Sequence, residues 1–188
     1  MARFTVIYDA CVLYPAPLRD TLMRLALTDL FKARWTDQIH EEWINALLRE
    51  GKYNKEKLER TRELMDQNVR DAKVTGYEEL IEMLTLPDPD DRHVLAAAIR
   101  ANADAIITFN RKDFPKEVLD TYAIDVIHPD DFIYYQIDMD PAKCCQAIKA
   151  QRLSLKNPEI ATEEFLGILL NQKLLQIVSK LREYEEFL

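Results

Sequence analysis

The run from Leu86 to Pro115, LPDPDDRHVLAAAIRANADAIITFNRKDFP, constrains the fold more than any other stretch of the chain. Its alanine-rich centre predicts a helix over Asp90–Asn102, and the apolar residues that follow predict a strand over Ala105–Phe109. Acids stand before the helix and after the strand. In a parallel α/β sheet, the carboxyl ends of the strands and the amino ends of the following helices share one edge, where ligands bind. The run therefore predicts acids gathered at one edge of such a sheet.

Short apolar runs and helical patterns alternate up to about residue 135. Further strands are expected at Phe4–Tyr8, Ala33–Thr36 and Ala123–Ile127, and helices at Leu18–Leu30, Asp37–Arg49, Asn54–Ala72 and Tyr77–Leu84. This alternation is typical of the α/β class, in which a parallel sheet is flanked by helices on both faces.

Only helical patterns follow Tyr135. Pro141 begins one predicted helix, and Thr162 begins another whose apolar stripe breaks near Asn171. We therefore predict two parts: an α/β domain at residues 1–135 and an all-helical C-terminal appendage at residues 136–188.

Composition and missing motifs argue against several classes of protein. A formal charge of −8 argues against a non-specific nucleic-acid binder, which would carry a basic excess, but it leaves open an enzyme that acts on nucleic acid. A zinc site is not expected, since the three cysteines form no CxxC pair and no second histidine stands at ligand spacing from His40 or His93. We interpret both histidines as structural or peripheral. The sequence also has neither a phosphate-binding glycine loop nor a glycine-flanked serine elbow.

No apolar run is long enough to span a bilayer. The segment MARFTVIYDA predicts a strand rather than a signal peptide. We therefore expect a cytoplasmic protein that does not bind to a membrane.

Four acids would be brought toward the same edge of the predicted sheet. Asp9 follows the first strand, Asp91 starts the alanine-rich helix, and Asp113 follows the next strand. Glu42 lies at the border of the apolar face of an early helix, whereas Glu41 points to solvent. Crowded carboxylates repel one another unless they are protonated or share a cation. A divalent metal site with oxygen ligands is the simplest explanation.

Each acid also has an ordinary structural interpretation. Asp9 could form a turn, Glu42 could be a solvated flank of its helix, and Asp113 could sit in an Asx turn or a surface ion pair. The acids between Asp88 and Asp91 could cap a helix, although one acid suffices for capping and this segment has three. Only the combination of these acids favours a functional site.

The acids, in this order, resemble the acidic set of the PIN domain, the nuclease fold of VapC-type toxins. The matching segments are IYDACVLYP, IHEEWINALL, LPDPDDRHVLAAAI and ADAIITFNRKDFP. The resemblance covers about residues 4–134. The segment LKNPEIATEEFLGIL is similar to the helical C-terminal extension of one bacterial subgroup of the family.

This resemblance implies a metal-dependent ribonuclease. The residues implied to be catalytic and to hold Mg²⁺ or Mn²⁺ are Asp9, Glu42, Asp91 and Asp113. Asp88 and Asn110 would be auxiliary ligands, and Asn110 departs from the family because many PIN domains carry an acid there. Arg19 and Arg92 are candidates for phosphate contact. A cation held by these acids would activate water for hydrolysis of an RNA phosphodiester bond. The implied partners are RNA and an inhibitory antitoxin protein. Separately, the apolar stripes of the C-terminal helices must pack on the α/β domain, on a second copy of the chain or on an antitoxin.

Two other functions remain open from the residues. One is a phosphatase that uses Asp9 as a nucleophile, although that chemistry usually requires a second acid two positions later, where this chain has Cys11. The other is a non-catalytic interaction module that keeps the fold without the activity. The presence of all four acids argues against the second alternative.

Overall fold

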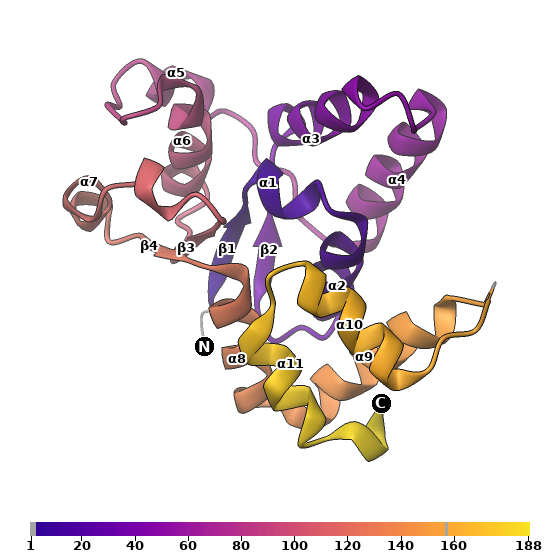
Figure 1. Cartoon of the computed structure of the whole chain (residues 1–188). Coiled ribbons are helices and arrows are strands. Elements are labelled where there is room, and N and C mark those ends of the chain that lie inside the picture. The colour runs from indigo at the N-terminus through magenta and orange to yellow at the C-terminus, as the bar shows by residue number, and fades with distance from the viewer. Residues whose placement is uncertain (1–2, 157) are drawn as a thin grey trace. The chain divides into compact units, whose positions relative to one another are not determined.

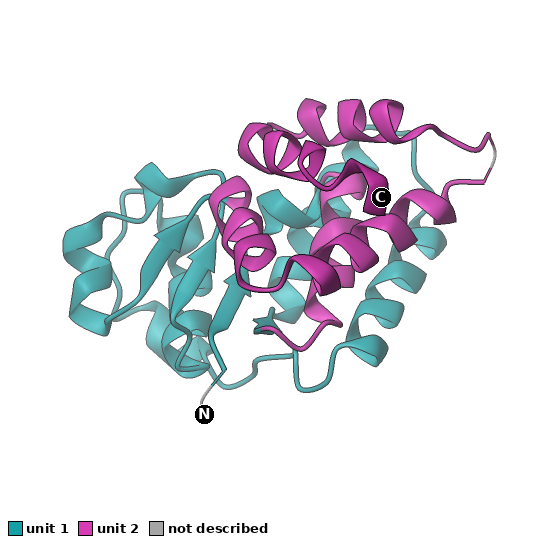
Figure 2. Ribbon diagram, turned by 90° about the horizontal axis from the view of Figure 1, so that it is seen from below, with its two compact units in different colours: residues 1–14, 31–128 teal, residues 15–30, 129–188 magenta. Residues whose placement is uncertain are grey.

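The computed structural model describes residues 3–156 and 158–188. The chain separates into two compact units, coloured differently in Figure 2. We call residues 1–14 with 31–128 the sheet unit, and residues 15–30 with 129–188 the helical unit. No helix in the described part of the chain combines the length and the apolar character needed to cross a membrane.

Four short parallel strands form the centre of the sheet unit (Figure 1). They are β1 (Thr5–Tyr8), β2 (Lys32–Arg34), β3 (Ala105–Ile107) and β4 (Asp125–Ile127), in the order β2-β1-β3-β4. Tyr8 pairs with Ile107, and Ile107 pairs with Ile127, so β1, β3 and β4 end level with one another. All four strands lie within or beside the predicted segments. Each is only three or four residues long.

The helices of the sheet unit begin and end largely where the sequence places caps. The helices are α1 (Ala10–Leu13), α3 (Asp37–Arg49), α4 (Lys55–Asn68), α5 (Glu78–Ile81), α6 (Arg92–Arg100) and α7 (Lys116–Leu119), with 3-10 turns η1 (Pro89–Asp91), η2 (Arg111–Asp113) and η3 (Asp120–Tyr122). The Thr36 hydroxyl accepts a hydrogen bond from the Ile39 N–H at the start of α3. Gly51 follows the end of α3 with a φ of 70°, a conformation that glycine adopts without strain.

The alanine-rich helix α6 packs against β1 and β3. Its residues Ala96, Ala97 and Ala98 are fully buried, and their small side chains let the helix lie close to the sheet. The acidic turn η1 leads directly into α6. Close packing therefore holds this turn near the sheet edge, as the sequence predicts.

A chain of buried polar groups joins α3 to α4 and to the residue after β2. The Trp35 indole donates to Asp66 Oδ1 at 2.8 Å, and His40 Nε2 lies 3.1 Å from the same oxygen. The Trp43 indole donates to His40 Nδ1 at 3.0 Å, so the neutral ring carries its hydrogen on Nε2. His40 therefore has a partner on each ring nitrogen, which agrees with its structural interpretation.

The helical unit consists of α2 (Ala16–Ala26), α8 (Pro129–Met139), α9 (Pro141–Ser154), α10 (Thr162–Asn171), α11 (Leu175–Arg182) and the turn η4 (Glu185–Phe187). Helix α2 packs against α9. The Thr21 hydroxyl donates to Gln151 Oε1 at 2.7 Å, and Gln151 Nε2 donates to the Pro17 carbonyl at 2.9 Å. The side chain of Asp130 accepts from the N–H groups of Gln176 and Ile177 at the start of α11.

The predicted fold class is confirmed: a parallel sheet with flanking helices and a helical C-terminal region. The predicted domain boundary at residue 136 stays a prediction. The packing adds two facts that the sequence pattern did not indicate. An early segment, residues 15–30, belongs to the same compact unit as the C-terminal helices, and α8 of that unit begins at Pro129.

Candidate active site

Asp9 lies at the point where the topology of the sheet changes direction. It directly follows β1, and its N–H donates to the Ile107 carbonyl at the end of β3. From β1 the chain continues to β2 on one side, and from β3 it continues to β4 on the other. In open α/β sheets, ligands bind in the crevice outside the carboxyl ends of two such strands. The Asp9 side chain is therefore placed at the edge that the sequence predicts, and it is only 5% exposed.

Two side chains fix the Asp9 carboxylate. The Thr108 hydroxyl donates to Asp9 Oδ2 at 2.6 Å, and the Cys11 thiol donates to the same oxygen at 3.2 Å. The hydroxyl also accepts from the Asn110 N–H at 2.9 Å. Burial raises the pKa of Asp9 above its ordinary value, while the hydrogen bonds from Thr108 and Cys11 oppose that shift.

The sequence interpretation missed both Thr108 and Cys11 as partners of Asp9. The signal for Thr108 was a polar residue at the end of a buried strand, beside an acid that ends the neighbouring strand. Cys11 had no such signal. Burial, and then the charge of Asp9, raise the pKa of Cys11 to about 12. At neutral pH the thiol therefore keeps its proton and serves as a hydrogen-bond donor rather than as a nucleophile.

Burial and three neighbouring acids act together on Asp91. It is half-buried at the end of η1, before α6. Burial, followed by the charges of Asp9, Asp88 and Asp113, raises the pKa of Asp91 to about 7. Asp9 and Asp113, which are distant from Asp91 in sequence, therefore act on it together with the nearby Asp88. The structure brings these side chains into one electrostatic group.

Glu42 joins this group from α3. Its charge raises the pKa of Asp9 further, and its side chain is half-buried, whereas Glu41 is exposed. This difference agrees with the predicted orientation of the two glutamates. Glu42 Oε1 lies 2.7 Å from Nε2 of His93, a residue of α6 that is 2% exposed. The sequence pattern favours a structural or peripheral role for His93 and does not indicate this contact with a candidate site residue.

The two predicted auxiliary residues are less deeply placed. Asp88 is exposed, and its side chain accepts a hydrogen bond from the Asp90 N–H, which is the capping role that the sequence also allowed. Asn110 is exposed, and its backbone N–H donates to the Thr108 hydroxyl. Of the two arginines considered for phosphate contact, Arg92 donates to the Pro89 carbonyl at 3.0 Å, and Arg19 belongs to the helical unit.

Among the described residues, no three histidine, cysteine, aspartate or glutamate side chains stand close enough together to hold a metal ion. The donor set nevertheless suits a hard cation, since Asp9, Glu42, Asp91 and Asp113 offer only carboxylate oxygens. Mg²⁺ keeps several of its waters and commonly binds through one or two carboxylates and a substrate phosphate. The arrangement therefore fits such an ion without a complete protein cage.

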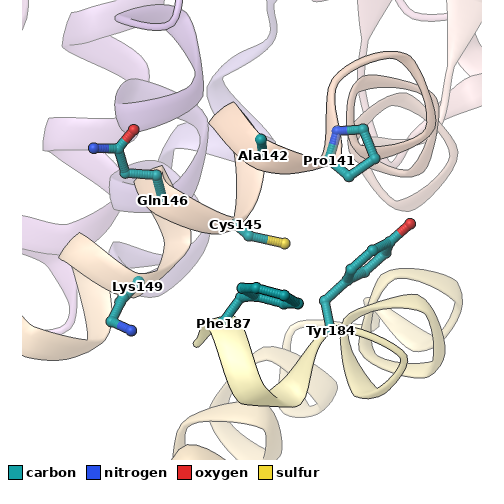
Figure 3. Close-up of a pocket in the computed structure, with 7 residues that line it drawn as sticks. All are labelled: Pro141, Ala142, Cys145, Gln146, Lys149, Tyr184 and Phe187. Atoms are coloured by element: carbon teal, nitrogen blue, oxygen red, sulfur yellow. The ribbon is translucent and has the colours of Figure 1, made fainter.

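Two hollows in the surface differ in whether they adjoin the candidate acids. One, of about 300 Å³, adjoins Glu42 and Cys11 and is further lined by Ala10, Tyr14, Trp43 and Ala46. The other, of about 360 Å³, lies in the helical unit, where Tyr184 and Phe187 face Cys145 (Figure 3). Its remaining lining residues are Pro141, Ala142, Gln146 and Lys149, so no acid faces it. Only the first hollow adjoins the candidate site.

Comparisons with known proteins identify the family of the chain. The sequence profile of the PIN domain matches residues 5–112, and that of the VapC50 C-terminal domain matches residues 129–183. A curated relative from Mycobacterium tuberculosis, named "Putative ribonuclease VapC50", is 47% identical over 64 residues. The alignment covers 34% of this chain and 37% of the relative, so the chain matches about a third of that protein. No solved structure gives a significant match. With more than half of its length matched by one family, the chain belongs to the PIN-domain family.

Proposed function

We propose that the protein is a divalent-metal-dependent ribonuclease that hydrolyses RNA phosphodiester bonds. The observation that carries the proposal is the group of acids at the carboxyl edge of the sheet. Burial and the charges of Asp9, Asp88 and Asp113 raise the pKa of Asp91, and the charge of Glu42 contributes to the raised pKa of Asp9. Support comes from membership in the PIN-domain family and from the name of the relative, which describes a ribonuclease.

Mg²⁺ or Mn²⁺ would bind at the acid group formed by Asp9, Glu42, Asp91 and Asp113, through one or two of these carboxylates at a time, and would keep several of its waters. When bound, the cation would lower the pKa of water and offset the negative charge that develops on the phosphate. The chain contributes preorganisation: Thr108 and Cys11 fix the Asp9 carboxylate before the substrate arrives. The protein itself would supply no covalent nucleophile.

We further propose that the protein is the toxin of a toxin–antitoxin pair, inhibited by a cognate antitoxin protein. This step rests on the VapC-type relative and on the matching C-terminal domain. A second copy of the chain is a further proposed partner.

The two alternative functions have less support. Asp9 would be a poor phosphatase nucleophile, because it is buried and Oδ2 already accepts two hydrogen bonds. A non-catalytic module would have no need of the acids that, together with burial, raise the pKa of Asp91 to about 7, since the repulsion between their charges destabilises the fold.

The test is cleavage of a short unstructured RNA by purified protein with Mn²⁺ or Mg²⁺, and with EDTA. We expect cleavage that EDTA abolishes, and a loss of at least about 100-fold in Asp9→Asn and Asp91→Asn, since even outer partners of a metal site matter by 10–100-fold. Asp125→Asn is the matched control, because this exposed acid starts β4 and so lies at the opposite end of the strands. Cleavage in EDTA, or full activity in both site variants, would refute the proposal. A phosphate trapped on Asp9 would instead support the phosphatase.

A further inference from the structure

His93 is the buried histidine nearest to the candidate site. It lies on α6, two residues after Asp91, and its side chain is 2% exposed. Its Nε2 is 2.7 Å from Oε1 of Glu42 on α3. The contact joins two helices that reach the sheet edge from different parts of the sequence.

The other ring nitrogen of His93 has an unusual environment. Within the part of the chain that the structure describes, His93 Nδ1 is buried and has no hydrogen-bond partner. A buried polar atom without a partner is destabilising, because it has lost its hydrogen bonds to water. His40, the other fully buried histidine, has a partner on each nitrogen. The contact with Glu42, together with the electrostatic interaction with Asp91, therefore offsets the burial of the His93 ring.

We propose that His93 is a positioning residue, which holds the Glu42 carboxylate in place for the cation at the acid group. This inference rests on the proposed metal-dependent function. The Nε2–H donates to Oε1 and fixes the orientation of a side chain that is otherwise 38% exposed. Ligating carboxylates commonly depend on such outer hydrogen bonds for their orientation.

Glu42 needs such a partner more than Asp9 does. A glutamate has one more rotatable bond than an aspartate, and it loses more conformational freedom when it is held in one position. Asp9 is itself buried and receives hydrogen bonds from Thr108 and Cys11. Glu42 stands at the border of α3, where solvent reaches it. Without the imidazole, its carboxylate would sample several orientations, and few of them would suit a cation.

A purely structural role for His93 makes a different prediction. If the ring only fills space beside the sheet, any side chain of similar volume would serve, and metal affinity would not depend on the position of a donor. If His93 positions Glu42, a substituted side chain can replace it only when its hydrogen-bond donor lies at the position of Nε2. Glutamine places its amide nitrogen near the position of Nε2, whereas asparagine places its amide nitrogen near the position of Nδ1.

The experiment measures Mn²⁺ affinity by calorimetry, without substrate, for wild type, His93→Gln, His93→Asn and His93→Leu. We expect His93→Gln to remain within about threefold of wild type, and His93→Asn and His93→Leu to bind Mn²⁺ about 10- to 100-fold more weakly. In a Glu42→Ala background, the His93 substitutions should have no further effect, since the group that His93 positions is already lost. Circular dichroism confirms that each variant is folded at the temperature of the titration.

His40→Gln is the control for general destabilisation, because it disturbs an equally buried histidine in the network of Asp66 and Trp43. It should lower the melting temperature without changing Mn²⁺ affinity. If wild type binds Mn²⁺ and His93→Asn binds it equally tightly, the positioning role is refuted while the proposed function stands. If wild type binds no divalent cation, the proposed function fails first, and this inference fails with it.

Discussion

Thr108 Oγ1 donates a 2.6 Å hydrogen bond to Asp9 Oδ2 across the ends of the adjacent strands β3 and β1. Both residues are buried, and the hydroxyl also accepts from the Asn110 N–H. One side chain therefore orients the most deeply buried candidate ligand and shapes the loop that leads to Asp113.

Replacing Thr108 by valine keeps the shape of the side chain but removes the hydroxyl. We expect Thr108→Val to lower the free energy of unfolding by about 1–3 kcal/mol, because the Asn110 N–H loses its acceptor and Asp9 loses its shorter hydrogen bond. Urea unfolding followed by circular dichroism measures the change. Thr108→Ser, which retains the hydroxyl, should lower the free energy of unfolding by less than Thr108→Val does. Equal stability of wild type and Thr108→Val would show that the bond contributes nothing to the fold.

Glu42 and Glu41 form a matched pair on one helix. Glu42→Gln removes a charge from the acid group but keeps an oxygen that can accept from His93, whereas Glu41 is exposed. We expect Glu42→Gln to reduce Mn²⁺-dependent RNA cleavage by about 10-fold or more, and Glu41→Gln to leave it unchanged. The readout is the initial rate at saturating Mn²⁺. Similar losses in both variants would contradict the assignment of Glu42 to the site.

Acid crowding gives the metal-free protein a characteristic pH dependence. The folded-state pKa of Asp91, about 7, lies above its ordinary value of 3.8. The stability linked to this group is therefore fully present below about pH 3.8 and is lost as the pH rises through 7. We expect Asp91→Asn to melt at a higher temperature than wild type at pH 8, and this advantage to shrink toward pH 5. The pair is measured in EDTA by thermal unfolding. An advantage that does not change with pH would exclude this mechanism.

Added Mg²⁺ should offset the same repulsion. A cation that binds only the folded protein raises its stability by mass action. We expect Mg²⁺ at pH 8 to raise the melting temperature of wild type more than that of Asp91→Asn. Equal shifts in the two proteins would mean that the ion binds elsewhere.

Removal of the C-terminal helices should affect the early helix α2. Within the helical unit, α2 packs against α9, and the side chains of Leu18, Leu22 and Leu25 are fully buried. Deleting the chain from Pro141 would expose apolar area on α2, so we expect aggregation of the truncated protein. Size-exclusion chromatography and light scattering measure it. Thr21→Val, which removes only the contact with Gln151, should remain soluble. A monomeric truncated protein would show that α2 does not need these helices.

The sequence was sufficient to predict features that depend on neighbours along the chain. Helix α3 has the predicted bounds, because Thr36 caps its start and Gly51 follows its end. The parallel sheet followed from alternating apolar runs and helices. The rule that strand ends share an edge predicted that Asp9, Asp91 and Asp113 lie near one another, while their role in a metal site stays a prediction. In each case the determining interaction is local or is a general property of the fold class.

Contacts between distant segments could not be predicted in the same way. The bonds of Thr108 with Asp9 and of His93 with Glu42 depend on which strands and helices are adjacent, and periodicity does not specify this. The grouping of α2 with the C-terminal helices could not be predicted for the same reason. An apolar helical face indicates that the helix is buried, but it does not identify the helix against which it packs.

The distribution of tryptophans makes the two compact units distinguishable by spectroscopy. The chain has two tryptophans, and both Trp35 and Trp43 are buried in the sheet unit, where hydrogen bonds link their indoles through Asp66 and His40. Intrinsic indole emission therefore reports on the environment of the sheet unit alone, whereas ellipticity at 222 nm would report on the helices of both. Coincident transitions by the two signals would mean that the units unfold cooperatively, and separated transitions would give each unit its own stability.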